Sequence, residues 1–222
     1  MLDGTPRFNK DGCGLHHFLQ VSGYATHSVL PEESVIPIRK DAPLDVVCLV
    51  SCGVLAGAGP VFNRAKVPPG ASVAVFGCGG VGLNTIQAAR LVGAGEIIAL
   101  DVMKQKLAWA EEFGATHVVD ASKEDPVARI QELSGRGGVD FAFEWSAPSA
   151  PWSRRSFPPI SAVPAWSSAC RRRARASRSI RRCSFSSACS PGSSFGGGHQ
   201  RTDVPMLIDL CTGGNRRGGA GC

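Results

Sequence analysis

The sequence predicts an α/β fold in which an incomplete parallel sheet is preceded by a shorter segment of barrel-like texture. Between residues 51 and 147, short apolar runs alternate four times with segments of helical character. Such alternation with short connections is typical of βαβ units, whose strands lie parallel in one sheet. One connection, residues 77–82, is a glycine-rich loop. Residues 1–50 contain short extended pieces separated by turns and prolines.

The first half of the alternation surrounds the glycine-rich loop. Residues 52–65 are small and apolar and predict a helix, which is followed by the turn Pro68-Pro69-Gly70. Residues 71–76 predict a buried parallel strand, because the run is short, apolar and bounded by turn residues. The loop then leads into a predicted helix over residues 83–92.

The second half repeats the pattern and completes four strands. Gly114 ends one of its helices, and Pro126 suits the first position of another. We expect the sheet to lack its last strands, because no strand or helix period continues after residue 147. The expected elements are a strand over 96–100 that ends on Asp101, a helix over 103–113, a strand over 117–120, a helix over 126–133 and a strand over 139–144.

The first fifty residues carry several turn signals. Asp3-Gly4, Asp11-Gly12 and Ser22-Gly23 are turn dipeptides. Residues 24–38 predict two strands separated by Pro31. This segment by itself indicates no function.

The loop Gly77-x-Gly79-x-x-Gly82 has the spacing of a dinucleotide-binding turn. Its glycines permit the tight turn out of the strand, the approach of a pyrophosphate, and close packing of helix on strand. The N-terminus of the following helix offers free N–H groups to phosphates. Asp101 lies 19 residues after Gly82, at the end of the next strand. A carboxylate there suits the ribose hydroxyls of NAD and repels the 2′-phosphate of NADP, which a merely packed turn does not explain.

Charge is divided unevenly along the chain. Residues 1–147 hold 12 Lys and Arg against 16 Asp and Glu, whereas residues 148–222 hold 12 Arg against two Asp. Residues 148–194 contain 14 Ser and nine Arg but no Asp, Glu or Lys. Two interpretations are open, an arginine-rich arm that binds nucleic acid or a stretch translated out of frame. We favour the second, because the composition suits shifted GC-rich codons and ordinary sequence resumes at Ser194.

Residues 75–84 (Val-Phe-Gly-Cys-Gly-Gly-Val-Gly-Leu-Asn) and 51–54 (Ser-Cys-Gly-Val) resemble the zinc-containing medium-chain alcohol dehydrogenases. The formaldehyde dehydrogenase branch, linked to glutathione or mycothiol, is similar. The resemblance covers about residues 3–146 and returns from 194 to 210. It implies a GroES-like barrel domain that holds zinc and a Rossmann domain that holds NAD. It also implies hydride transfer between an alcohol carbon and the nicotinamide.

The resemblance implies roles for individual residues. Cys52 would be a ligand of the catalytic zinc, and Ala56 departs from the hydroxyl residue that is common at its position. Asp101 would bind the adenosine ribose, accompanied by Lys106, and Phe195 would lie near the nicotinamide. No catalytic residue is assigned. The implied cofactor-binding residues are Gly77, Gly79, Gly80, Val81, Gly82, Asp101, Lys106 and Phe195.

The implied zinc site is incomplete. The family's first catalytic cysteine, its Gly-His-Glu motif and its four structural-zinc cysteines precede the region that Met1–Lys10 resembles. A catalytic zinc normally takes three protein ligands, of which Cys52 is one. We therefore expect an inactive fragment read from an internal methionine. The remaining candidates are interpreted as ordinary residues of the fold: His16, His17 and His27 as polar barrel residues, and Cys48 as a buried small residue.

Four segments summarise the expected organisation. They are a partial GroES-like catalytic domain (1–50), the NAD-binding Rossmann domain (51–147), an aberrant Arg/Ser-rich segment (148–193), and a residual Rossmann piece with a tail (194–222). No signal peptide and no apolar run of membrane-spanning length is found in the sequence. We expect a cytoplasmic protein whose partner is a small alcohol or aldehyde, with neither membrane nor nucleic acid as a partner.

Intact relatives are expected to be homodimers. Two alternative functions stay open. A zinc-free, NAD(P)-dependent quinone reductase-like enzyme would have no need of Cys52, and a nucleic-acid-binding protein would use the arginine-rich segment.

Overall fold

The computed structural model describes two compact units, Met1–Pro37 and Ile38–Cys222. The boundary between the two units, after Pro37, precedes the boundary predicted at residue 50. The four segments predicted from the sequence stay a prediction. Within the described residues, no helix has the length and apolar character needed to cross a bilayer. The described residues are 5–6, 8–16, 26–28, 30–135, 137–145, 165–167 and 195–213.

The first unit contains a β-hairpin made of β1 (Phe8–Lys10) and β2 (Cys13–Leu15). Asp11 and Gly12 form its turn, with φ angles of +52° and +81°. Two consecutive positive φ values are those of a type I′ turn, whose twist matches the paired strands. The predicted Asp11-Gly12 turn is therefore confirmed. Asp3-Gly4 and Ser22-Gly23 lie outside the described residues.

The described part of residues 24–38 differs from the prediction of two strands. It contains one short 3₁₀ turn, η2 (Glu32–Ser34), and otherwise irregular chain. Pro31 and Pro37 lack the backbone N–H that a strand ladder uses. Each proline interrupts the hydrogen-bond ladder that a strand through its position would need.

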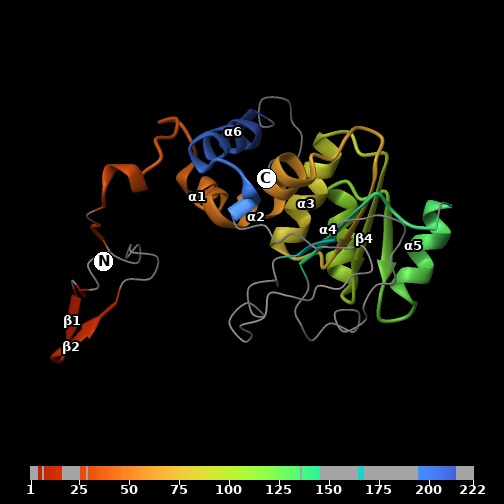
Figure 1. Cartoon of the computed structure of the whole chain (residues 1–222), viewed down its shortest axis with the longest axis horizontal. Coiled ribbons are helices and arrows are strands. Elements are labelled where there is room, and N and C mark those ends of the chain that lie inside the picture. Colours follow the sequence, from red (N-terminus) through yellow and green to blue (C-terminus); the bar gives the residue numbers. More distant parts are fainter. Residues whose placement is uncertain are drawn as a thin grey trace, which may run out of the picture. The chain divides into compact units, whose positions relative to one another are not determined.

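The second unit is built on a parallel sheet, and the predicted α/β fold is confirmed (Figure 1). The strand order is β5-β4-β3-β6-β7, so the chain starts in the middle of the sheet and builds outward on both sides. The four strands predicted from the sequence are all present. They are β3 (Ser72–Phe76), β4 (Glu96–Asp101), β5 (His117–Asp120) and β6 (Phe141–Glu144).

β7 (Ala165–Ser167) is an addition to the prediction. It lies in the Arg/Ser-rich segment, for which we expected no regular structure, and it pairs in parallel with β6. The expectation that the sheet ends at β6 is therefore wrong, because β7 adds a fifth strand beside it. A three-residue strand is too short to show an alternating pattern in the sequence. Pairing with β6, and not local propensity, makes these residues a strand.

Helices cover the sheet on both sides. The predicted helix over 52–65 is confirmed, but its turns are partly π-helical, and a two-residue turn separates them from a short helix that begins at Leu44. The predicted helices after β3, β4 and β5 are also present. The helices are α1 (Leu44–Val47), η3 (Val50–Val54), α2 (Leu55–Gly59), η4 (Pro60–Ala65), α3 (Gly80–Leu91), α4 (Lys104–Glu112), α5 (Pro126–Ser134), η6 (Phe195–Gly197) and α6 (Gln200–Gly213).

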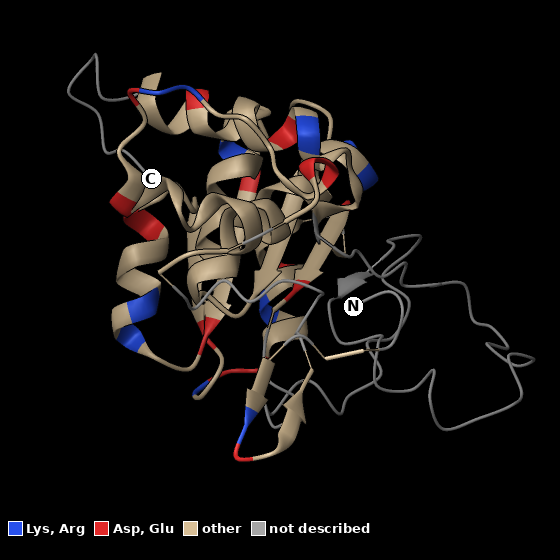
Figure 2. Ribbon diagram, turned by 90° about the vertical axis from the view of Figure 1, so that its left-hand side faces the viewer, with Lys and Arg blue, Asp and Glu red and all other residues tan. Residues whose placement is uncertain are grey.

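The core is formed by apolar strand residues and the helices packed on them. One buried cluster joins Ala74 of β3 and Ile98 of β4 to Ile130 of α5. On the other side of the sheet, α2 and α3 cross closely because a Cβ at Gly57 would overlap the backbone of Val81. The charged residues of β4, β5 and β6 lie at strand ends, which leaves the strand interiors apolar (Figure 2).

Candidate functional site

The glycine-rich loop joins the end of β3 to the start of α3. Gly77 has a φ of +90°, a conformation that L side chains rarely adopt. Its N–H donates to the carbonyl oxygen of Leu100 at 2.8 Å, which fixes the loop to β4. A Cβ on Gly82 would overlap the carbonyl oxygen of Gly77. The first and third glycines are therefore required by the backbone itself.

The second glycine has a different environment. Gly79 is the residue that precedes α3, and no side chain caps the helix there within the described part of the chain. A Cβ added to Gly79 or Gly80 would meet no heavy atom within 4 Å. The first N–H groups of a helix lack intrahelical partners and carry partial positive charge. This end of α3 is thus an open, donor-rich surface. The helix begins three residues before the predicted start.

Asp101 ends β4 and is 5% exposed. Its Oδ2 accepts from the N–H of Cys78 at 2.8 Å, and its Oδ1 accepts from Val102 at 2.8 Å and Met103 at 3.0 Å. The carboxylate therefore connects the glycine-rich loop to the turn that precedes α4. Its two oxygens offer about four acceptor positions, so one remains for another donor. Lys106 Nζ lies 3.9 Å from Oδ2.

Cys78 occupies the second position of the loop and is buried. Burial, reinforced by the nearby Asp101 carboxylate, raises the pKa of the Cys78 thiol to about 12. Its Sγ lies 3.6 Å from the carbonyl oxygen of Leu100. A thiol that stays protonated at neutral pH is neither a nucleophile nor a metal ligand. Cys78 therefore serves packing, and sequence reasoning assigned it no role.

Cys52, the one predicted zinc ligand, is an exposed free thiol in η3. Cys48 is also exposed, so the interpretation of Cys48 as a buried residue is wrong. Its Sγ donates to the carbonyl oxygen of Asp45 at 3.4 Å. Among the described residues, no group of three or more His, Cys, Asp or Glu could hold a metal ion. These residues do not fit a complete zinc site.

Phe195 is the first residue of the turn η6. The next residue, Gly196, has a φ of +75° and lies against α2, because a Cβ on Gly59 would overlap it. Asn63 Nδ2 lies 3.5 Å from the carbonyl oxygen of Gly196 and 2.8 Å from Asp203 Oδ2. The described contacts of this turn are thus with α2 and η4, and Asn63 of η4 in turn binds α6. Its predicted place near the nicotinamide stays a prediction.

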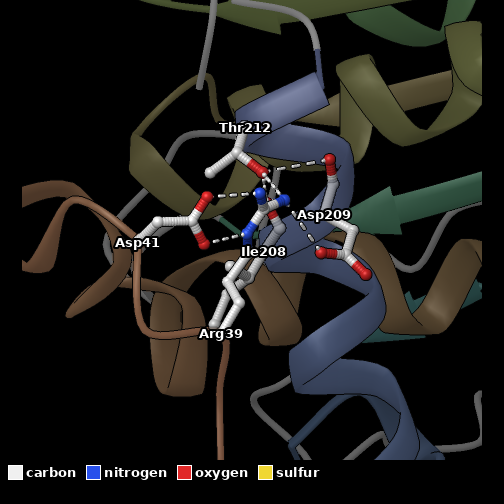
Figure 3. Close-up of polar contacts among 5 residues, drawn as sticks. All are labelled: Arg39, Asp41, Ile208, Asp209 and Thr212. Atoms are coloured by element: carbon white, nitrogen blue, oxygen red, sulfur yellow. Dashed lines mark hydrogen bonds and ion pairs between the residues drawn. The ribbon is translucent and has the colours of Figure 1, made fainter.

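An ion cluster that sequence reasoning missed joins residues 39–41 to α6 (Figure 3). Arg39 makes two hydrogen bonds to Asp41, with Nε–Oδ1 and Nη2–Oδ2 distances of 2.7 and 2.6 Å. Its Nη1 donates to Thr212 Oγ1 at 3.1 Å and lies 3.4 Å from Asp209 Oδ1. Hydrogen bonding and the charge of Asp41 raise the pKa of Arg39. No sequence motif signals partners so far apart along the chain.

Together, the sheet order and the glycine-rich loop define a Rossmann-type α/β protein, in which ligands bind at the carboxyl ends of the strands. Residues 80–154 match the zinc-binding dehydrogenase family model. The resemblance to the zinc-containing alcohol dehydrogenases is therefore confirmed.

Two curated relatives match 94% of this chain. They are an alcohol dehydrogenase class-3 of Cereibacter sphaeroides, 37% identical, and an S-(hydroxymethyl)glutathione dehydrogenase of Paracoccus denitrificans, 35% identical. The chain spans 58% of the length of each relative.

Solved structures agree with the sequence matches. An alcohol dehydrogenase zinc-binding domain protein of Burkholderia ambifaria is similar with a TM-score of 0.73 and 30% identity, over 90% of this chain and 55% of that chain. A benzyl alcohol dehydrogenase of Acinetobacter calcoaceticus is similar with a TM-score of 0.70 and 27% identity, over 95% of this chain and 60% of that one.

Proposed function

We propose that this chain is the dinucleotide-binding part of a zinc- and NAD-dependent alcohol dehydrogenase. The observation that carries the proposal is the open start of α3 beside the buried carboxylate of Asp101. Gly79 and Gly80 leave free space where a pyrophosphate would meet backbone N–H groups. The names of the relatives support an alcohol, or a hydroxymethyl–thiol adduct, as the substrate of the longer protein.

Each implied cofactor residue would have a separate task. The backbone of Gly79, Gly80 and Val81 would bind the pyrophosphate, while Gly77 and Gly82 hold the loop in shape. Asp101 would accept from a ribose hydroxyl through its remaining lone pair, and its charge would disfavour the 2′-phosphate of NADP. Lys106, which is one-third exposed, would balance that charge. NAD, when bound, accepts the hydride from the substrate carbon.

Zinc belongs to the proposal for the longer protein. Cys52 would supply one ligand, and the described residues contain no group that completes the set. We therefore assign this chain no step that uses zinc, and we propose that it does not oxidise an alcohol by itself. A cytoplasmic location and a homodimer, as implied for intact relatives, are parts of the same proposal.

The two alternative functions rest on other observations. A zinc-free quinone reductase-like enzyme fits the loop equally well, but the match to a zinc-binding family favours the first proposal. A nucleic-acid-binding function would use the arginines of residues 148–193, which lie largely outside the described residues. The nucleotide sequence of the gene tests the alternative of a frame shift, which predicts single-base shifts near codons 146 and 194.

Calorimetric titration of the purified chain with NADH and NADPH tests the proposal. We expect NADH to bind more tightly than NADPH, and we expect Asp101→Ser to reduce the difference between them. A Gly80→Val variant should weaken the binding of both, because its side chain would occupy the open space above the loop. Equal binding by all three proteins, or alcohol oxidation with NAD that a chelator inhibits, would contradict the proposal for this chain.

A further inference from the structure

Trp145 follows β6 at the point where the strand order of the sheet reverses. The chain runs from β3 to β4 and β5 on one side, and then returns to β6 on the other side. The N–H of Trp145 donates to the carbonyl oxygen of Phe76 at 2.8 Å, so the ladder between β3 and β6 continues through Trp145. Phe76 directly precedes Gly77. In open α/β sheets, this reversal point is where ligands bind.

Alternation along β6 predicts that the side chain of Trp145 belongs to the sheet face that α3 covers. Side chains alternate along an extended strand, so Trp145 shares the face of Phe143 and is opposite Ala142. Ala142 packs against the cluster that contains Ile130 of α5, on the far side of the sheet. Phe143 and Trp145 therefore face the layer of α3, which begins at the glycine-rich loop.

The indole Nε1 of Trp145 is a buried donor that has no hydrogen-bond partner in the part of the chain that the structure describes. An unpartnered buried N–H is unfavourable, and each case in a folded protein calls for an explanation. An indole N–H can only donate, as can the backbone N–H groups of the nearby loop. A ligand that satisfies both must present several acceptor oxygens. Glu96 Oε2, the second such atom among the described residues, is an acceptor and lies at the opposite end of the sheet.

We infer that the Trp145 indole N–H donates to an oxygen of the bound dinucleotide, in its pyrophosphate or an adjoining ribose. The inference rests on the proposed function and adds a binding residue to it. Trp145 and the loop then hold the phosphates from two adjacent strands, β6 and β3. Loss of the indole N–H should weaken binding without altering the glycine-rich loop.

Titration of the full chain with ADP-ribose, which has the pyrophosphate and both riboses but no nicotinamide, tests the inference. Trp145→Phe keeps an aromatic ring and removes the donor. We expect its Kd to rise by about tenfold, the size typical of a hydrogen bond to a charged group. Trp109→Phe is the matched control, because Trp109 is 41% exposed on α4. Its Kd should equal that of the unmodified chain.

The melting temperature of the free protein separates binding from folding. Trp145→Phe removes an unpartnered buried donor, so we expect its melting temperature to equal or exceed that of the unmodified chain. A lower melting temperature with an unchanged Kd for ADP-ribose would show a purely structural role and overturn the inference. Failure of the unmodified chain to bind ADP-ribose would overturn the proposed function as well.

A second measurement does not depend on how well Trp145→Phe folds. In Trp109→Phe, excitation of the remaining tryptophans should produce emission from bound NADH by energy transfer. The double variant Trp109→Phe/Trp145→Phe should give less of this emission than Trp109→Phe, although Trp152 and Trp166 can still contribute to it. Binding of NADH to Trp109→Phe without sensitised emission would overturn the inference, because it would place Trp145 away from the dinucleotide.

Discussion

The β3–α3–β4 region and the α6 region belong to one compact unit, yet different contacts hold them. In the first, glycines let backbone segments touch, and the buried carboxylate of Asp101 binds three backbone N–H groups. In the second, side chains form the links. Asn63 binds Asp203 near the start of α6, and Arg39 binds Thr212 near its end. Where backbone segments touch, an added side-chain atom should destabilise the fold. Where exposed side chains make the contacts, stability should instead depend on their charges.

Substitution of the third loop glycine should give the largest effect. In Gly82→Ala, the new methyl group would overlap the carbonyl oxygen of Gly77, whose own N–H is bonded to β4, so either α3 or the loop must shift. We expect a loss of about 3 kcal/mol in the free energy of unfolding. Urea denaturation measures it. Gly80→Ala, whose Cβ meets nothing within 4 Å, is the control and should unfold like the unmodified chain.

Removal of the Asp101 charge should have the next largest effect. In Asp101→Asn, an amide NH₂ replaces one carboxylate oxygen and faces backbone donors instead of accepting from them. We expect a loss of about 2 kcal/mol in the free energy of unfolding, measured without nucleotide. Asp125→Asn is the control, because Asp125 caps α5 through Val127 and asparagine caps equally well. Equal losses in the two variants would contradict the linking role of Asp101.

Acidification should weaken β5, whose last residue pairs with Asp101 in the sheet register. Hydrogen bonds from Ser122 and Lys123 lower the pKa of Asp120 from its ordinary 3.8 to about 2. A lowered pKa stabilises the fold above the unfolded-state value, and this contribution is lost as the pH falls from about 4 to about 2. The difference in melting temperature between the unmodified chain and Asp120→Asn should narrow over that range.

Ser122→Ala is the matched control for Asp120, because it removes the donor with the largest effect on that pKa. The acid transition attributed to Asp120 should then move toward higher pH. A transition that stays in place would mean that another carboxylate is responsible for the acid sensitivity.

Changes at Arg39 should have the smallest effect, and salt should remove it. The Arg39 side chain is 31% exposed, and such ion pairs contribute little in water. For Arg39→Met we expect a melting temperature lower by roughly 2 °C or less at low salt. The difference should vanish at high salt, because the pairs are screened. Arg39→Lys should recover part of it, and a salt-independent decrease would indicate packing instead of charge.

Local sequence predicted the βαβ region closely. The runs around β3, β4 and β5 are short and apolar, and turn residues bound them, so local pattern and tertiary role agree. The same reasoning failed for residues 24–38, where two prolines interrupt any strand ladder. It also failed for β7, which is three residues long and depends on its pairing with β6. The exposure of Cys48 was also missed, because residue type alone does not show that its turn after α1 faces solvent.

By itself, the sequence determined the glycine spacing, the position of Asp101 and the α/β class, since each depends on residues close together along the chain. Only the tertiary structure decided that Gly82 meets Gly77, that Asp101 holds the loop through Cys78, and that Trp145 lies beside the end of β3. It also decided that Arg39 binds α6. These contacts join residues from separate elements, and their proximity follows from the strand order, which no local pattern encodes.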